Sequence, residues 1–267
     1  MDTLVKAALL GVVQGVTEFL PVSSTAHLLI ANRLLGFQDP GGVFTVMIQL
    51  GSIVAVVWLY RAKVLDVVRG LPSKPEARRF VLTLFIAVVP ALVAGGVLSG
   101  FVTRVLYNTL EVIGVTFVLG GVVILIVERL QPTPTVRDVD STPVGTALGV
   151  GICQAVAIVP GVSRSGATII GGLAIGLERT VATEFSFYLA MPTLTAAFAN
   201  SLWRVRHEIA AAQSTEITIG FVMAFISSAL VIKPFLRYVS GHGFTWFAWY
   251  RILAGLALLI ALGAGWF

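Results

Sequence analysis

The sequence predicts an all-α polytopic membrane protein with about six transmembrane helices and two re-entrant hairpins made of broken helices. Of its 267 residues, 57% are hydrophobic and only 12% are charged, whereas a typical soluble domain has roughly 25% charged residues. Several apolar runs approach the roughly 20 residues that a membrane-spanning helix needs. Two further apolar stretches are interrupted in their middles by proline, glycine, serine and charged residues.

The uninterrupted apolar runs are the predicted transmembrane helices, near residues 42–60, 80–99, 112–128, 185–203, 216–236 and 249–267. The interrupted stretches lie near 4–35 and 144–178. Irregular backbone at membrane depth is tolerated only where it is buried in protein or lines a wet cavity. We therefore expect each interrupted stretch to enter the membrane, turn and leave on the same side.

The two interrupted stretches resemble each other. Identical residues at an offset of 140 pair Gly11, Gln14, Val16, Val22 and Ser23 with Gly151, Gln154, Val156, Val162 and Ser163. The sequence therefore predicts a single integral membrane domain, 1–267, made of two repeats at approximately 1–130 and 144–267, with a proline-containing linker between them. Chance matching of apolar segments is the alternative explanation.

Basic residues are expected to orient the chain in the membrane. The net charge is +5, but Lys and Arg occupy connections between apolar runs and form no basic face, which argues against a nucleic-acid partner. The segment 61–79 is rich in Lys and Arg, as cytoplasmic loops are. With that segment inside, the first hairpin opens outward and the second opens toward the cytoplasm. This is the inverted-repeat arrangement of many transporters.

The first hairpin carries polar side chains at Gln14, Glu18, Ser23, Ser24, Thr25 and His27. Gln14 and Glu18 are four residues apart and share one helical face. Pro21 lacks a backbone donor, so the helix should end just before it. Ser23 or Ser24 would then cap the next helix. The exposed N–H groups at such a helix start make an anion site.

The second hairpin repeats this arrangement of a helix start with hydroxyl side chains, and it adds a positively charged residue. Its segment 160–168 contains Ser163, Arg164, Ser165 and Thr168. An arginine at the bilayer centre costs about 2.5 to 3.5 kcal/mol on insertion scales, so Arg164 needs a partner. A phosphate matches the bidentate fork of its guanidinium group. Two facing helix starts, an arginine and several hydroxyls therefore predict a phosphate site.

Structural explanations compete with this interpretation. Ser and Thr in membrane helices mostly bond the backbone or a neighbouring helix, which would account equally well for Thr25, Ser165 and Thr168. Glu18 and Arg164 would also be explained as an ion pair that bridges the two repeats. The Cys and His spacing of a zinc site is absent from the sequence.

The two polar segments resemble the signatures of the bacterial undecaprenyl-diphosphate phosphatases associated with bacitracin resistance. The runs 19–27 and 160–168 carry the resemblance, which extends over nearly the whole chain. It implies an enzyme of the bacterial inner membrane that removes the terminal phosphate of undecaprenyl diphosphate, a prenyl diphosphate lipid. That reaction recycles the lipid carrier for cell-wall synthesis. The resemblance also implies a divalent cation, Mg²⁺ or Ca²⁺.

The same resemblance implies roles for individual residues. The catalytic residues would be Glu18, Ser24, His27 and Arg164, with Glu18 also a candidate metal ligand. The phosphate-binding residues would be Gln14, Ser23, Thr25, Ser163, Ser165 and Thr168. Gln14 departs from the family pattern, because many members have glutamate there. An amide cannot act as a carboxylate base or a charged ligand.

Two chemical routes stay open from the sequence. In the first, Ser24 attacks the terminal phosphorus while Arg164 stabilises the transferring phosphoryl group. Glu18 and His27 would then either take the serine proton or hold the cation. In the second, a metal-activated water replaces the serine.

Two other functions compete with this one. A type-2 phosphatidic acid phosphatase is disfavoured, because the further catalytic His and Asp pattern of that group does not follow Arg164. A lipid-phosphate flippase or secondary transporter is the alternative from another class, since inverted repeats with broken helices are typical of transporters. The outward mouth of the first hairpin predicts access from the periplasmic face. A surface for close helix contact, and so for a homodimer, is offered by Gly114, Val118, Gly120 and Gly121.

Overall fold

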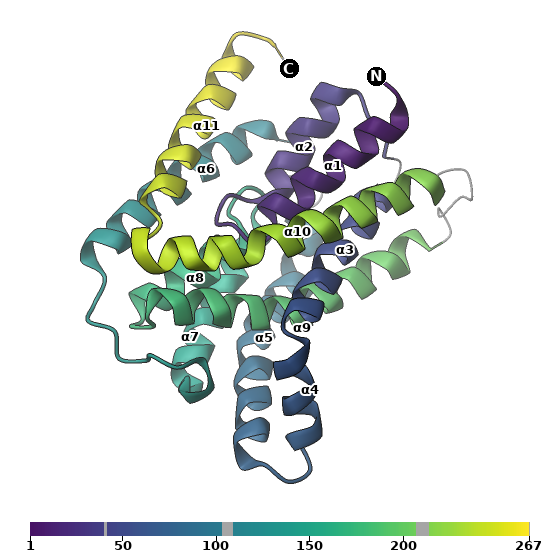
Figure 1. The fold of residues 1–267 in the computed structure, drawn as a ribbon. Helices are drawn as coiled ribbons and strands as arrows, with labels where there is room; N and C mark the ends of the chain where they lie inside the picture. Colours follow the sequence, from purple (N-terminus) through teal and green to yellow (C-terminus); the bar gives the residue numbers. More distant parts are fainter. Residues whose placement is uncertain (40–41, 103–108, 207–213, 267) are drawn as a thin grey trace.

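The structure is a computed structural model that describes residues 1–39, 42–102, 109–206 and 214–266. Its α-helices are α1 (Thr3–Thr17), α2 (Ser24–Leu35), α3 (Val43–Leu59), α4 (Arg61–Gly70), α5 (Pro75–Phe101), α6 (Leu110–Leu130), α7 (Val144–Ala155), α8 (Arg164–Ala174), α9 (Arg179–Val205), α10 (Ser214–His242) and α11 (Thr245–Gly263). Short 3₁₀ helices span Val139–Ser141 and Val156–Ile158. Within the described ranges, β structure is limited to one isolated bridge, between Val136 and Leu177. The predicted all-α fold is confirmed (Figure 1).

The long helices account for the predicted membrane spans. Within the described ranges, α5, α6, α10 and α11 are long and apolar enough to cross a membrane, and α3 with α4, which meet at a bend of 72°, would make a fifth span. The sixth predicted run, 185–203, lies within α9. Phe185, Leu189 and Ala190 on this helix are fully buried, because α3, α5, α8 and α10 pack around it. Protein rather than lipid therefore surrounds much of α9.

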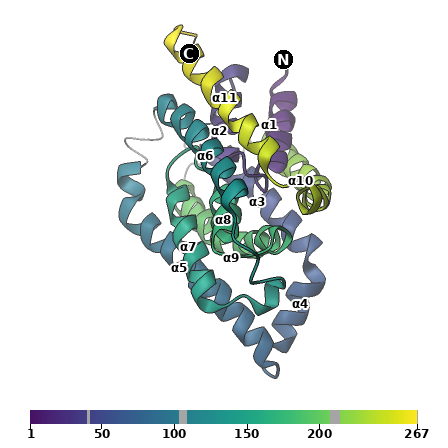
Figure 2. The ribbon, with the colours of Figure 1, turned by 90° about the vertical axis from the view of Figure 1, so that its left-hand side faces the viewer.

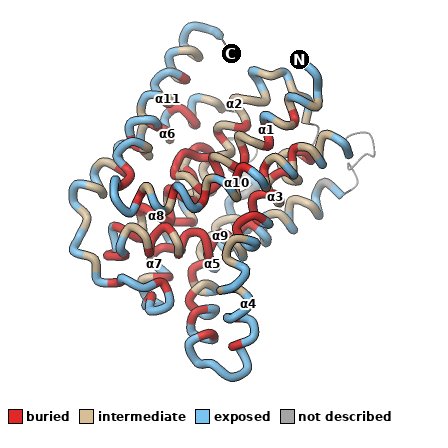
Figure 3. The backbone as a smooth tube through the Cα atoms, in the orientation of Figure 1, coloured by how far each residue is buried: buried red, intermediate tan, exposed pale blue. Residues whose placement is uncertain are grey.

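Large apolar side chains cover the outer faces of the long helices. Phe85 on α5, Leu230 on α10 and Ile260 on α11 are 63%, 69% and 71% exposed. Buried residues gather instead where the short hairpin helices meet α9 and α10 (Figure 3). Apolar exposure of this extent marks a surface that meets another apolar phase. The chain is therefore a multi-pass membrane protein.

Both interrupted stretches form broken helices, as the sequence predicts. The first hairpin is α1 and α2, and the second is α7, its 3₁₀ extension and α8. Ser23 and Ser163, each immediately before the second helix of its hairpin, have φ values of 67° and 68°. Non-glycine residues rarely adopt this left-handed region, and strain of this kind concentrates at functional sites. The matching strain places equivalent turns at the two hairpin tips.

Each hairpin packs against a long helix from the other half of the chain. Gly11 on α1 lies so close to the Gly220 carbonyl on α10 that an added Cβ atom would come within 2.3 Å of it. Gly151 on α7 would meet the Ala87 carbonyl on α5 at 2.4 Å. This reciprocal packing, together with the matching helix order, supports the two-repeat organisation, which stays a prediction.

The structure adds detail at two places named in the sequence analysis. The basic segment 61–79, expected as a cytoplasmic connection, consists of α4, a turn and the start of α5. The four residues that were expected to offer a surface for a homodimer lie against α11 of the same chain, and the homodimer stays a prediction. Added Cβ atoms at Gly114 and Gly121 would meet Leu259 and Ala248 there. Close helix contact does occur at these glycines, but within one molecule.

Candidate active site

The two hairpin tips meet in the middle of the molecule and are joined by polar contacts. Ser165 donates a hydrogen bond of 2.7 Å to the Leu20 carbonyl, and Arg164 forms an ion pair of 3.3 Å with Glu18. These contacts bring the N-terminal ends of α2 and α8 toward one site. Figure 2 shows α8 in the centre of the bundle, among α6, α7 and α9. The predicted meeting of two helix starts is confirmed.

Glu18 is the centre of the hydrogen-bond network. It lies at the end of α1 and is 5% exposed. Its Oε2 accepts hydrogen bonds from Gln14 Nε2 at 2.9 Å and from Ser24 Oγ at 2.6 Å. Its Oε1 faces Arg164 Nη2 at 3.3 Å. The Gln14 amide can therefore donate a hydrogen bond to the Glu18 carboxylate, which a second carboxylate at this position could do only when protonated.

Ser24 is the hydroxyl best placed for nucleophilic chemistry. It is the first residue of α2, so its Oγ lies beside the unpaired N–H groups of the helix start. Its hydrogen bond of 2.6 Å to Glu18 places a nucleophile next to a base. Proton transfer between two such groups requires a separation of roughly 2.6 to 3.2 Å. The arrangement can deprotonate Ser24 without help from a third residue.

Arg164 provides the positive charge of the site. Besides Glu18, its Nη1 donates to the carbonyl and hydroxyl oxygens of Ser186 on α9, at 3.3 and 3.4 Å. Its Nε is buried without a hydrogen-bond partner among the described residues. A buried donor without a partner is costly. The guanidinium group is therefore equipped to receive an additional acceptor, such as a phosphate oxygen.

The remaining hydroxyls divide into paired and unpaired groups. Ser163 Oγ accepts from Gly166 N at 3.0 Å and caps α8, and Thr168 Oγ1 lies 3.0 Å from the Arg164 carbonyl oxygen and 2.6 Å from Ser186 Oγ. Ser165 and Thr168 thus have the partners that a structural role requires. Within the described ranges, the hydroxyls of Ser23 and Thr25 form no hydrogen bond. These two are free to bind a ligand.

His27 is directed away from the Glu18 and Ser24 pair. Its Nδ1 lies 2.8 Å from the Ser23 carbonyl oxygen, which can only accept, so Nδ1 carries a hydrogen. Its Nε2 lies 2.5 Å from the Tyr250 hydroxyl on α11, and the two rings stack at 5.7 Å. In neutral His27 this nitrogen accepts a hydrogen bond from the tyrosine hydroxyl. The expected grouping of the imidazole with Ser24 is therefore not formed by direct hydrogen bonds.

Sequence reasoning missed three residues of the site. Arg251 on α11 is 1% exposed and donates to carbonyls at both hairpin tips. A charge inside the predicted span 249–267 was a sequence signal for it, because charges within spans are usually functional. Tyr250, its neighbour, and Ser186 gave no such signal, since single Tyr and Ser residues are common in membrane helices.

The described side chains do not form a resident metal site on their own. No group of three or more His, Cys, Asp and Glu side chains lies close enough within those ranges to hold a metal ion. Glu18 is the carboxylate that joins the two tips, and both of its oxygens already have partners. Mg²⁺ and Ca²⁺ need several oxygen ligands. The protein alone fits neither cation well.

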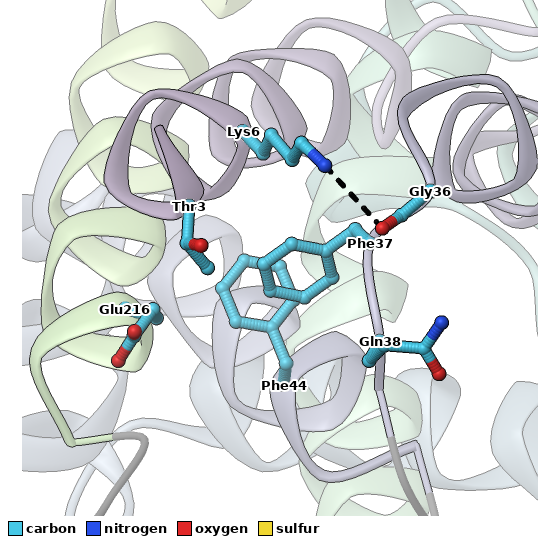
Figure 4. A pocket seen from close by; sticks show the side chains of 7 residues that line it. All are labelled: Thr3, Lys6, Gly36, Phe37, Gln38, Phe44 and Glu216. Carbon is cyan, nitrogen blue, oxygen red and sulfur yellow. Dashed lines mark hydrogen bonds between the residues drawn. The ribbon is translucent and has the colours of Figure 1, made fainter. Parts of the chain in front are cut away.

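A separate cavity of about 240 Å³ lies between the start of α1, the end of α2 and the starts of α3 and α10. Figure 4 shows the Phe37 and Phe44 rings side by side in it, with Lys6 reaching the Gly36 carbonyl. None of the predicted site residues lines this cavity. The polar network at the hairpin tips, rather than this cavity, is the candidate active site.

Comparisons with known proteins agree with the motifs. The family model described as bacitracin resistance protein BacA matches residues 7–257. An undecaprenyl-diphosphatase of Cereibacter sphaeroides (strain ATCC 17025) is 45% identical over 264 residues, covering 99% of this chain and 98% of the relative. One from Rhizorhabdus wittichii is 47% identical, covering 97% and 98%. Undecaprenyl-diphosphatase 2 of Rhodospirillum rubrum is also 47% identical, covering 98% and 96%. The chain therefore belongs to the bacitracin resistance protein BacA family.

Proposed function

We propose that the chain hydrolyses undecaprenyl diphosphate to undecaprenyl phosphate and inorganic phosphate. The observation that carries this function is the 2.6 Å contact between Ser24 and Glu18 beside the partly buried Arg164. The three relatives above are named as diphosphatases, which favours hydrolysis over the flippase alternative. The product is the lipid carrier of cell-wall synthesis, and its recycling accounts for a role in bacitracin resistance.

The proposed chemistry uses the serine route. Arg164 and the N–H groups that start α2 and α8 bind the diphosphate. Ser24 Oγ bonds to the terminal phosphorus as its proton passes to Glu18. The bond from that phosphorus to the bridging oxygen breaks, and undecaprenyl phosphate leaves with the proton. Water then attacks the phosphoserine while Glu18 takes a proton from it, and Ser24 recovers its hydroxyl as phosphate departs.

A divalent cation, Mg²⁺ or Ca²⁺, is proposed to arrive with the substrate. The diphosphate oxygens would supply most of its ligands, because Mg²⁺ commonly binds through one or two carboxylates plus substrate phosphates. The Glu18 carboxylate would contribute at most one ligand, since it also serves Ser24. When bound, the cation would neutralise charge on the diphosphate.

Replacement of Ser24 by alanine tests the serine route. Loss of the nucleophile is expected to lower phosphate release from undecaprenyl diphosphate by at least about 10³-fold. Ser23→Ala removes the neighbouring hydroxyl, which forms no hydrogen bond within the described ranges. This variant should lose far less activity than Ser24→Ala. Near-normal turnover by Ser24→Ala would instead favour the metal-activated water. In the same assay a chelator should stop the wild-type reaction, and added Mg²⁺ or Ca²⁺ should restore it.

We further propose that the protein lies in the inner membrane with the site opening to the periplasm. The lone Cys153 is replaced by alanine, and Thr25→Cys is introduced at the free hydroxyl of the first hairpin. A membrane-impermeant maleimide should label this variant in spheroplasts from outside. Ser73→Cys, in the exposed turn between α4 and α5, is the matched control and should react only after the membrane is opened. The reverse pattern would invert the topology.

A further inference from the structure

An apolar groove of about 450 Å³ runs between α6 and the second hairpin. Its α6 wall contains Leu119 and Val123, which are 58% and 50% exposed. The opposite wall is one face of α8, where Ala167, Gly171 and Ala174 recur at helical spacing. These three small residues, which flank Ile170 on the same wall, leave room for a branched hydrocarbon. The groove is a place for an apolar chain rather than for a polar ligand.

One end of the groove lies at the candidate active site. Val162, Gly166 and Arg251 line this end. The Gly166 N–H group donates a hydrogen bond to the hydroxyl of Ser163, the residue before Arg164. Arg251 donates to backbone carbonyls of both hairpin tips. Helix α8 therefore presents Ser165 and Thr168 on one side and the groove on the other. Because residues that line this end also contact the hairpin tips, a lipid whose charged head binds between the tips has this groove beside it for its apolar tail.

We propose that this groove holds the isoprenoid units of the lipid substrate that lie next to its diphosphate. The inference rests on the proposed function, because that function places the diphosphate at Arg164. Bulk acyl chains also meet the groove in a membrane. The substrate chain has the advantage of being tethered, since binding of its head group raises the effective concentration of its tail beside the groove.

Cys153 offers a native reporter, because it is the single cysteine of the chain and lines the groove. Wild-type protein is treated with N-ethylmaleimide, and modification of Cys153 is followed by mass spectrometry. Undecaprenyl phosphate, the product, should slow the modification at least about tenfold at saturation, whereas inorganic pyrophosphate should not. The control is Cys153→Ala with Val97→Cys, a lipid-facing position on α5 that is 75% exposed, where neither ligand should protect. Absence of protection at Cys153, or equal protection by an ordinary phospholipid, would overturn the proposal.

Ala167→Phe gives a second measurement. Filling the groove should raise KM for undecaprenyl diphosphate about tenfold, the effect of a lost apolar contact of this size, with a smaller change in kcat. Val97→Phe adds the same bulk toward lipid and should retain the wild-type KM. An unchanged KM in Ala167→Phe would count against the groove. Because wild-type phosphate release is measured separately, failure of the groove proposal is distinguishable from failure of the proposed function.

Discussion

Arg164→Lys is expected to reduce phosphate release by about 10³-fold or more, the scale of the contribution that an arginine makes to phosphoryl transfer. Lysine keeps the positive charge beside Glu18, so the ion pair with the first hairpin can persist. Lysine lacks the planar, forked guanidinium group, so the variant loses the unpaired Nε donor and the hydrogen bonds to Ser186. The measurement is kcat/KM for undecaprenyl diphosphate in detergent, alongside the melting temperature of each preparation.

The matched control is Arg179→Lys. Arg179 also forms a forked, partly buried ion pair, with Glu128 on α6, at 2.8 Å. That pair lies away from the hairpin tips, so its loss should lower stability slightly and leave kcat/KM near the wild-type value. A folded Arg164→Lys enzyme with nearly normal kcat/KM would remove Arg164 from the phosphate site and support the purely structural ion pair.

Arg251→Met is expected to have the largest effect on stability. The two terminal nitrogens of Arg251 donate to the carbonyl oxygens of Pro21, Val162, Thr116 and Gly161, at 2.8 to 3.4 Å. Methionine fills similar volume but leaves these buried acceptors without their donor. Loss of a buried polar network of this kind costs about 3 to 5 kcal/mol. Thermal unfolding in detergent measures the loss, and phosphate release should fall with it because the two tips lose their shared anchor.

Arg237→Met is the control for Arg251→Met. Arg237 is exposed near the end of α10, and its replacement should leave both melting temperature and activity close to wild type. A fully active Arg251→Met protein that melts at the wild-type temperature would show that the contacts of Ser165 and Arg164 suffice to join the tips.

The sequence predicted the fold through features that act locally. Pro21 and the serines that follow it predicted a break after the first helix, which ends at Thr17, and the spacing of Gln14 and Glu18 places their side chains together. Contacts between distant segments could not be predicted in the same way. The bond from Arg251 to Pro21 depends on how α11 crosses both hairpins. The stacking of His27 on Tyr250 depends on the same crossing, so local spacing alone placed His27 beside the wrong partners.

The site itself was predicted unevenly for the same reason. Glu18, Ser24 and Arg164 lie within the two motifs, and the structure brings them together. Ser165 and Thr168 lie in the motif as well, but their hydroxyls bond the backbone and Ser186. A motif identifies residues that share a neighbourhood. It does not determine which hydroxyls are satisfied by protein and which, like that of Ser23, are left for a ligand.

The close contact of Gly11 with Gly220 has a consequence for biogenesis. The first hairpin leaves the ribosome long before α10, the helix against which α1 packs, has been made. Until then the polar side chains of Gln14 and Glu18 lack their final surroundings, and α1 is too short to be a conventional span. The hairpin that is synthesised first must therefore reach its native position late. A chain truncated before α10 should leave its N-terminal segment accessible to proteases at the membrane surface.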